Sequence, residues 1–223
     1  MLRGESTTYN ARMKAGNSEY VWCKIDVSPV VEENVPTRMI GVITNISPMK
    51  KEADALKERV NFDSFTQLYN KEYAISAMKN ILSFDATDQH ALLLLDIDNF
   101  KVFNDSKGHL EGDHVLKMTS ELIKNTFRQS DIMGRFGGDE FIILVKKLPG
   151  YEWLEERLNR LCYCENGEYS ISNSIGVAFY PQDGTEFDEL FEKADQALYD
   201  SKIEKGRYTM YTDIKHTDQR NGL

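Results

Sequence analysis

Residues 135–141 read RFGGDEF, and they place two glycines and two carboxylates before a long apolar run. Short apolar runs on both sides of a glycine pair are typical of a β-hairpin. We therefore expect strands at 132–136 and 141–145, with Asp139 and Glu140 at the turn. Taken alone, this pattern fits an acidic, exposed hairpin tip as well as it fits a functional site.

The composition of the chain limits its class. With 223 residues, of which 41% are hydrophobic, we expect a soluble globular protein with one substantial core and a small extra module. The formal net charge of −9 argues against a general surface for nucleic acid or anionic membranes, although a few cations could still hold phosphates. No apolar run approaches the roughly 18 residues of a membrane span, and the N-terminus does not resemble a signal peptide. The chain nevertheless looks cut from a longer protein.

The cysteines and histidines give no metal-binding pattern. Cys23, Cys162 and Cys164 are odd in number and contain no CxxC pair, so neither a disulfide framework nor a structural zinc site is predicted. We expect Cys162 and Cys164 to be core or surface thiols and the protein to be cytoplasmic. His90 and His109 have no His or Cys partner at metal-binding spacing, which favours structural or solvent-exposed roles.

The first 48 residues predict a β meander, with β-prone runs at 20–27 and 38–46 separated by turn signals. This segment resembles the C-terminal half of a PAS sensor domain. The matching residues are Gly16, Tyr20, Trp22, Pro29 and the stretch 41–46. The helical, ligand-binding half of that family has no counterpart here, which implies that a sensory pocket is missing too. A plain β-hairpin extension explains the same pattern.

Residues 49–62 predict a connecting helix, because they contain no glycine and space their apolar residues by four, three and four positions. Those residues are Met49, Ala53, Leu56 and Val60. Such a stripe suits a parallel dimer stalk, and it suits equally a helix that packs on its own domain.

From Asp63 to about residue 213 the pattern becomes that of a mixed α/β domain, followed by a tail at 214–223. Apolar spacing predicts helices around 74–82, 115–127, 154–161 and 190–198, and strands at 91–97, 132–136, 141–145, 169–179 and 208–211. This order fits an α+β, ferredoxin-like fold with a mainly antiparallel sheet and helices covering one face.

Acidic residues are expected to meet at one end of this sheet. Asp96 and Asp98 lie where the strand 91–97 ends, and the hairpin turn brings Asp139 and Glu140 close if the strands are neighbours. Carboxylates that close repel one another in a poorly solvated site, and an oxygen-loving cation such as Mg²⁺ would relieve the repulsion. Asp98 could instead cap a helix or pair with a cation.

Four sequence blocks together resemble the GGDEF family of diguanylate cyclases, over Asp63 to about Tyr211. Besides RFGGDEF they are DSFTQLYNK (63–71), DIDNFKVFNDSKGHLEGD (96–113) and ADQALYDSK (194–202). The resemblance implies that two GTP molecules are condensed into cyclic di-GMP with release of pyrophosphate. It also implies a homodimer in which each subunit supplies one half-site.

The resemblance implies roles for the acidic residues. Asp96 and Glu140 would bind Mg²⁺ (or Mn²⁺) with help from the Ile97 carbonyl, and Asp139 would be a metal ligand or a base toward the 3′-hydroxyl. Which of Asp139 and Glu140 takes the proton is left open. Gly137 and Gly138 would permit positive φ and let a phosphate approach the backbone.

Other residues would bind the nucleotide. Asn104 and Asp113 resemble the pair that reads guanine, since a carboxylate accepts from N1–H and the amino group while an amide offers a donor and an acceptor. Lys101 and Lys202 would meet phosphates. The segment after Lys202 is one residue longer than in the family, so a phosphate role for Arg207 is open. The residue that could substitute for it is Lys205.

Arg128 and Asp131 form the string RQSD, and five residues separate it from Gly137. In the family, an R-x-x-D motif at this position forms an inhibitory site for the product. A guanidinium can hold a phosphate or the O6 and N7 edge of guanine, and a carboxylate accepts from guanine N1–H. The alternative is a local ion pair that caps the preceding helix.

Three functions therefore stay open. The intact acidic turn favours an active cyclase over a weakly active or inactive domain that serves as a cyclic di-GMP receptor or dimerisation module. A cyclase for another nucleotide is disfavoured, because both guanine-reading positions match.

Overall fold

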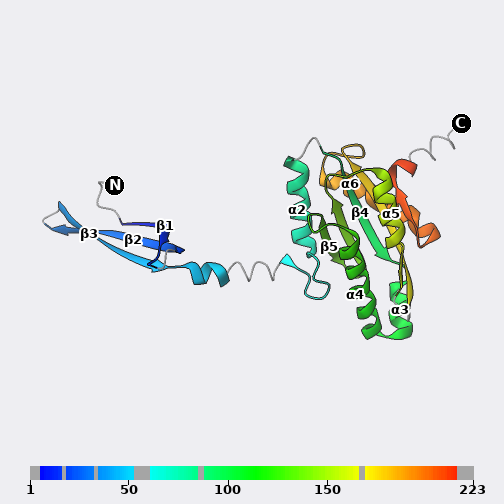
Figure 1. Cartoon of the computed structure of the whole chain (residues 1–223), viewed down its shortest axis with the longest axis horizontal. Coiled ribbons are helices and arrows are strands. Elements are labelled where there is room, and N and C mark those ends of the chain that lie inside the picture. The colour runs from blue at the N-terminus through cyan, green and yellow to red at the C-terminus, as the bar shows by residue number, and fades with distance from the viewer. Residues whose placement is uncertain are drawn as a thin grey trace. The chain divides into compact units, whose positions relative to one another are not determined.

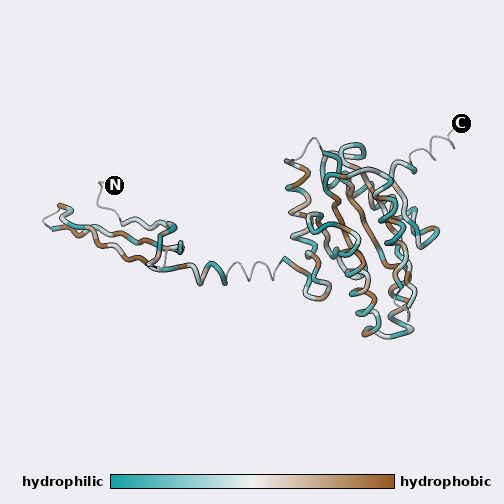
Figure 2. Tube along the Cα trace, in the orientation of Figure 1, coloured by the Kyte–Doolittle hydropathy of each residue, from teal (hydrophilic) through white to brown (hydrophobic). Residues whose placement is uncertain are grey.

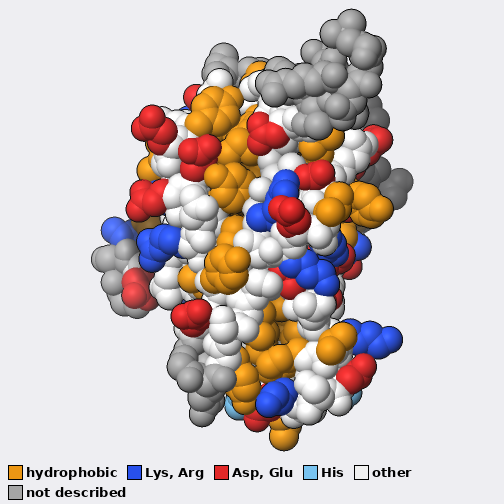
Figure 3. Space-filling model, turned by 90° about the vertical axis from the view of Figure 1, so that its right-hand side faces the viewer, with side chains coloured by type: hydrophobic (Ala, Val, Ile, Leu, Met, Phe, Trp, Pro, Cys, Tyr) orange, Lys and Arg blue, Asp and Glu red, His pale blue; other side chains and the backbone are white. Residues whose placement is uncertain are grey.

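The structure is a computed structural model, shown in Figure 1, and it describes residues 6–16, 19–32, 35–52, 61–84, 88–165 and 169–214. The chain divides into two compact units, Met1–Arg59 and Val60–Leu223. Within the described ranges, no helix has both the length and the apolar character needed to cross a membrane. On the face seen in Figure 3, acidic and basic side chains are interspersed among apolar ones.

The first unit is an antiparallel sheet of three strands in the order β1-β2-β3. The strands are β1 (Thr7–Lys14), β2 (Tyr20–Glu32) and β3 (Val35–Asn45). The strands expected at 20–27 and 38–46 are therefore present. β2 is longer than expected. β1 is an additional edge strand, and its residues lie before the two β-prone runs.

Alternation along these strands gives the sheet one apolar face. Ile25 pairs with Tyr9 on one side and with Ile43 on the other, so these three side chains share that face. Cys23 is buried on it, whereas Tyr9 and Ile43 are 41% and 56% exposed. The opposite face carries charged residues, among them Lys24 next to Cys23 in the chain.

Residues 47–52 are helical and begin the connecting segment. Ser47 Oγ accepts a hydrogen bond of 2.8 Å from the backbone N–H of Trp22, which ties the start of this helix to β2. Most of the apolar stripe expected at 49–62 falls on residues 53–60, which lie outside the described residues.

The second unit is built on a sheet with the strand order β5-β6-β4-β8-β7, and β9 also pairs with β8. Its strands are β4 (His90–Ile97), β5 (Ile132–Gly137), β6 (Glu140–Val145), β7 (Tyr163–Glu165), β8 (Ser170–Tyr180) and β9 (Tyr208–Met210). The pairs are antiparallel except β8 with β9, which are parallel. The α+β, ferredoxin-like class is confirmed. β7 was not expected, because three residues are too few to show an alternating pattern.

Helices cover both faces of this sheet, which corrects the expected one-sided cover. They are α2 (Lys71–Phe84), α3 (Phe100–Lys107), α4 (His109–Thr126), α5 (Tyr151–Leu161) and α6 (Phe187–Ser201), followed by the 3₁₀ turn η1 (Lys202–Glu204). Residues of α4 and α5 join one buried cluster, and residues of α2 and α6 join the other.

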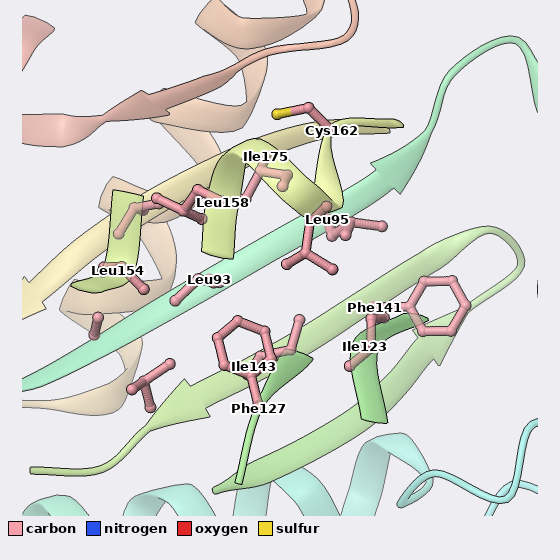
Figure 4. Packing of buried hydrophobic residues seen from close by; sticks show 14 of the residues in the cluster. Leu93, Leu95, Ile123, Phe127, Phe141, Ile143, Leu154, Leu158, Cys162 and Ile175 are labelled. Atoms are coloured by element: carbon pink, nitrogen blue, oxygen red, sulfur yellow. The ribbon is translucent and has the colours of Figure 1, made fainter. Parts of the chain in front are cut away.

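The central strand β4 explains this double cover. Leu93 and Leu95 belong to the cluster under α4 and α5, and Figure 4 shows them among side chains from α5 and from β6. Leu92 and Leu94 belong to the cluster under α2 and α6. A strand that is apolar on both faces needs helices on both. Figure 2 accordingly shows hydrophobic strands in the interior of this unit.

Candidate functional site

The pairing of β4 with β6 places the predicted carboxylates together. Asp96 lies opposite Glu140 in the register, and the backbone N–H of Ile97 donates to the Asp139 carbonyl at 3.3 Å. The hairpin turn therefore lies at the carboxyl end of β4, as the sequence predicted. Asp96 is mostly shielded, with 14% of its side chain exposed.

Asp96 has a cationic partner in this structure. Lys202 Nζ lies 2.8 Å from Asp96 Oδ2. Burial raises the pKa of Asp96 above its ordinary value, the ammonium group of Lys202 partly offsets this, and the charges of Asp139 and Asp98 raise it further. The site therefore concentrates negative charge and attracts cations.

Glu140 experiences the same field. Burial and then the charge of Asp96 raise its pKa, Lys202 lowers it, and Asp139 and Asp195 raise it again. Carboxylates that crowd together and have raised pKa values are a common feature of functional sites.

The donor set suits a hard divalent ion. Asp96, Glu140 and the carbonyl of Ile97 offer only oxygen, which is the ligand type that Mg²⁺ prefers. Among the described residues, no three His, Cys, Asp or Glu side chains form a ready-made metal cluster. The residues thus fit an ion that brings further oxygen ligands with it, as Mg²⁺ bound to a triphosphate does.

The glycine turn is open to solvent at Gly137 and Gly138, and hydrogen bonds from Arg135 fix its backbone. Gly138 has φ of +54°, and an added Cβ at Gly137 or Gly138 would meet nothing within 4 Å. Arg135 donates to the Gly138 carbonyl from Nε at 3.0 Å and from Nη2 at 2.8 Å, and its Nη1 lies 3.4 Å from Asp63 Oδ2. No role is predicted for Arg135 from the sequence, although it stands in RFGGDEF and its partner Asp63 opens another of the four blocks.

The predicted guanine readers lie on α3 and α4. The Asn104 side chain packs against the backbone of Gly112, so that a Cβ added at Gly112 would lie 1.7 Å from Asn104 Oδ1. That oxygen is buried and has no hydrogen-bond partner among the described residues. Asp113 follows Gly112 directly and is partly buried, while Lys101 is exposed on α3. An acceptor left without a donor in this way is suited to a ligand.

Asp98 has neither of its expected roles. The residue before α3 is Asn99, in the left-handed conformation at φ of +56°, and no ion pair of Asp98 occurs in the described part of the chain. Asp98 is instead 7% exposed and accepts hydrogen bonds from the hydroxyls of Ser172 and Ser174 and from the N–H of Gly206. Three accepted hydrogen bonds and burial make it a structural carboxylate.

Arg207 and Lys205, two candidate phosphate ligands after α6, have different partners in the structure. Arg207 is held by Asp200 at 2.9 Å and by Glu204 at 3.4 Å. Lys205 Nζ donates to Asn99 Oδ1 at 2.6 Å, next to the end of β4. Of the two, Lys205 is therefore the one that lies beside the predicted site.

The RQSD string is partly buried. Asp131 is 3% exposed, and its two oxygens accept the backbone N–H groups of Arg128 at 2.9 Å and Lys146 at 3.1 Å. The expected local alternative, an ion pair, is thus replaced by backbone hydrogen bonds. The Arg128 side chain is exposed, and its guanidinium carbon lies 5.0 Å from the centroid of the Trp153 ring. Arg157 stacks on the same ring at 3.6 Å.

The remaining candidates lie apart from the carboxylates. His90 is buried and its Nδ1 accepts the N–H of Lys147 at 3.1 Å, whereas His109 is exposed at the start of α4. Cys162 and Cys164 are both buried. An open hollow of about 680 Å³ lies between α4 and β7, and its lining includes none of the predicted site residues.

Comparison with protein families gives a match to "Diguanylate cyclase, GGDEF domain" over residues 60–207. The diguanylate cyclase DgcS of Shewanella oneidensis is 34% identical over 146 residues, which cover 63% of this chain and 49% of that protein. The cyclic di-GMP phosphodiesterase NbdA of Pseudomonas aeruginosa is 33% identical over 158 residues, which cover 66% of this chain and 20% of that protein. The chain thus spans half or less of the length of these two relatives.

Solved structures give a consistent match. The GGDEF domain of DgcB from Caulobacter crescentus, in complex with c-di-GMP, has a TM-score of 0.61 at 25% identity and covers 68% of this chain and 93% of that one. A microbial GGDEF domain described in a novel interaction mode with cyclic di-GMP has a TM-score of 0.60 at 32% identity, and covers 70% of this chain and 99% of that one.

Proposed function

Because the chain belongs to the GGDEF domain family, we propose that it is a diguanylate cyclase that condenses two GTP molecules into cyclic di-GMP and releases two pyrophosphates. The observation that carries this proposal is the pairing of Asp96 with Glu140 beside an open glycine turn. That arrangement offers oxygen ligands, a cation and room for a phosphate at one end of a rigid sheet.

The acidic end of the sheet would hold the metal and the phosphates. Asp96, Glu140 and the Ile97 carbonyl would bind Mg²⁺ (or Mn²⁺), which when bound neutralises charge on the triphosphate. Lys202, now paired with Asp96, would be released to a phosphate oxygen, and Lys101 would approach from α3. Alignment and charge neutralisation supply most of the catalysis in phosphoryl-type transfer.

The reaction needs two copies of this site. Each 3′-oxygen attacks the α-phosphorus of the other GTP, the bond to pyrophosphate breaks, and the 3′-hydroxyl proton leaves to a base. Asp139 and Glu140 both lie at the glycine turn where the phosphate would bind, so either could serve as that base. Since one chain has one set of these groups, we infer that a homodimer brings two half-sites face to face.

Guanine would be selected between α3 and α4. The unpaired Asn104 Oδ1 could accept from the guanine amino group, and Asp113 could accept from N1–H. Adenine lacks both of those donors at its corresponding edge. A pocket whose buried acceptors stay unpaired with the wrong base discriminates strongly.

The product would bind at a second place, around Arg128. Its exposed guanidinium and that of Arg157 flank the Trp153 ring, so that two positive charges and an aromatic face lie together. Asp131, with both oxygens engaged by backbone N–H groups, would shape this loop rather than contact the ligand. We propose that cyclic di-GMP inhibits the enzyme here.

The first unit would connect the enzyme to a signal. Residues 1–48 fit the C-terminal part of a PAS-like sensor in having an antiparallel sheet with one apolar face. Residues 49–62 would join it to a cyclase domain at 63–213, which acts in the cytoplasm.

One experiment separates the enzyme from the alternative. The purified chain is incubated with GTP and Mg²⁺, and the mixture is analysed for cyclic di-GMP by mass spectrometry. Formation of the product supports the cyclase. If no product forms while added cyclic di-GMP binds, the chain is a receptor instead.

A further inference from the structure

The carboxylate of Asp98 joins three segments at the proposed site. Its Oδ1 accepts from Ser174 Oγ at 2.7 Å, and its Oδ2 accepts from Ser172 Oγ at 2.6 Å and from the N–H of Gly206 at 2.9 Å. Its own N–H donates to the Ser172 carbonyl at 2.9 Å. Both carboxylate oxygens are thus occupied by donors from β8 and from the loop after η1.

The segment 202–206, which consists of η1 and the two residues after it, carries two cations of the site. We call residues 202–206 the cation loop, because Lys202 pairs with Asp96 and Lys205 donates to Asn99. Lys202 therefore contacts a residue two positions before Asp98, and Lys205 contacts the residue directly after it. The hydrogen bond from the Gly206 backbone N–H to the Asp98 carboxylate is the backbone contact that fixes the cation loop at this position.

The local sequence is suited to this contact. Gly206 has φ of +74°, which a residue with a side chain adopts rarely, and a Cβ there would lie 2.8 Å from the Tyr163 hydroxyl. The loop is one residue longer than the family pattern K-x-x-G-R, and Arg207, beyond it, is turned to Asp200.

We propose that Asp98 is a positioning residue that holds the cation loop against the end of β4, so that Lys202 and Lys205 are placed to bind the phosphates of the substrate. The proposal rests on the proposed function for the identity of the substrate. Asp98 itself does not touch the nucleotide, because burial and three accepted hydrogen bonds withdraw its oxygens from solvent.

The test uses the full chain with Asp98→Asn. The asparagine has the same size, but its amide group is a donor where Asp98 accepts, so at least one of the three bonds is lost. Hydrogen exchange at the amides of the cation loop should become at least about tenfold faster. The KM for GTP should rise about tenfold with a smaller change in kcat, because the lysines bind phosphates in the ground state as well as in the transition state.

A matched control removes a buried carboxylate elsewhere. Asp183 is 2% exposed and accepts the N–H of Phe179 at 2.9 Å, in the turn after β8. Asp183→Asn should lower the Tm and leave both the KM and the exchange of the cation loop unchanged. If Asp183→Asn raises the KM as much as Asp98→Asn does, the effect is general destabilisation and the proposal is wrong.

If Asp98→Asn does not fold, a second variant tests the proposal. The double change Ser172→Ala and Ser174→Ala keeps the carboxylate and removes two donors, so it should loosen the cation loop in the same direction. Unchanged exchange and unchanged affinity for the α,β-methylene analogue of GTP in the folded variants would overturn the proposal. If the wild-type chain does not bind the analogue, the proposed function fails, while the exchange measurement still decides whether Asp98 holds the loop.

Discussion

Lys202 Nζ and Asp96 Oδ2 lie 2.8 Å apart, so a lysine from the turn after α6 neutralises the carboxylate at the end of β4. A metal ion bound to the Asp96 carboxylate would repel this ammonium group, since both are positively charged. The Asp96 carboxylate thus has a counter-cation in this structure, which under the proposed function would move to a phosphate oxygen when substrate binds.

Replacing Glu140 by Gln should reduce kcat/KM for cyclic di-GMP formation by at least about a hundredfold, because a charged metal ligand is lost while the shape is kept. Product formation is followed by chromatography with a fixed excess of Mg²⁺. Glu156→Gln, at a side chain that is 73% exposed on α5, is the matched control and should behave as wild type. Near-normal turnover of Glu140→Gln would show that the metal assignment is wrong.

The same substitution should raise the Tm of the ligand-free chain at neutral pH. Burial and the neighbouring charge of Asp96 raise the pKa of Glu140 in the fold, so the folded chain binds that proton more tightly than the unfolded chain does. The ionised group therefore opposes folding above its raised pKa and has no effect below its ordinary value of 4.5, where it is protonated in both states. The gain in Tm should be present at about pH 7.5 and vanish at about pH 4. A gain of equal size at both would contradict this account.

Specific activity should rise with protein concentration, because the proposed reaction needs half-sites from two chains. The initial rate per mole is measured over about a hundredfold dilution, with GTP held constant. Analytical ultracentrifugation over the same range gives the fraction of dimer, which the activity should follow. Activity per mole that stays flat while the dimer dissociates would contradict the two half-sites.

Gly112→Ala should raise the KM for GTP by about tenfold or more, because the added Cβ would lie 1.7 Å from Asn104 Oδ1 and displace that side chain. Gly150→Ala is the control, since a Cβ at that position meets nothing within 4 Å. Circular dichroism establishes that both variants keep their fold. An unchanged KM in Gly112→Ala would remove Asn104 from guanine recognition.

Arg128→Ala should leave catalysis intact, weaken cyclic di-GMP binding by at least about tenfold, and let the product accumulate to a higher level. Titration calorimetry in a Glu140→Gln background measures the affinity without turnover. Arg160→Ala, at an exposed position near the end of α5, controls for the loss of a surface charge. Equal product affinity in Arg128→Ala and in the control would place the inhibitory site elsewhere.

Much of the second unit could be predicted because its signals are local. The run ALLLLDI indicates a buried strand, and the two glycines of RFGGDEF indicate a hairpin, so the meeting of Asp96 with Glu140 follows once the strands pair. The cover on both faces could be read from the same run, since Leu92 and Leu93 point to opposite sides. The expectation that helices cover only one face of the sheet did not take this alternation into account.

Other features depend on contacts that no local pattern reveals. Asp98 resembles a helix cap in sequence, but its partners Ser172 and Ser174 lie 74 and 76 positions away, and only the pairing of β4 with β8 brings them together. Arg135 and Asp63 are 72 positions apart in the chain, and their side chains interact at 3.4 Å next to the glycine turn. Carboxylates whose partners are so distant in the chain are defined by the tertiary structure rather than by their neighbours in sequence.

The three cysteines have a practical consequence for chemical labelling. Cys23, Cys162 and Cys164 are all buried, and burial raises the pKa of the Cys162 thiol to about 11. Burial shields all three thiols from reagents, and the raised pKa of Cys162 also keeps that thiol out of the reactive thiolate form, so the native cysteines are poor targets for maleimide dyes. A single cysteine introduced at an exposed position such as Tyr199, which is 76% exposed on α6, can therefore carry a fluorophore without prior removal of the native cysteines. Energy transfer between two such chains would report their encounter directly.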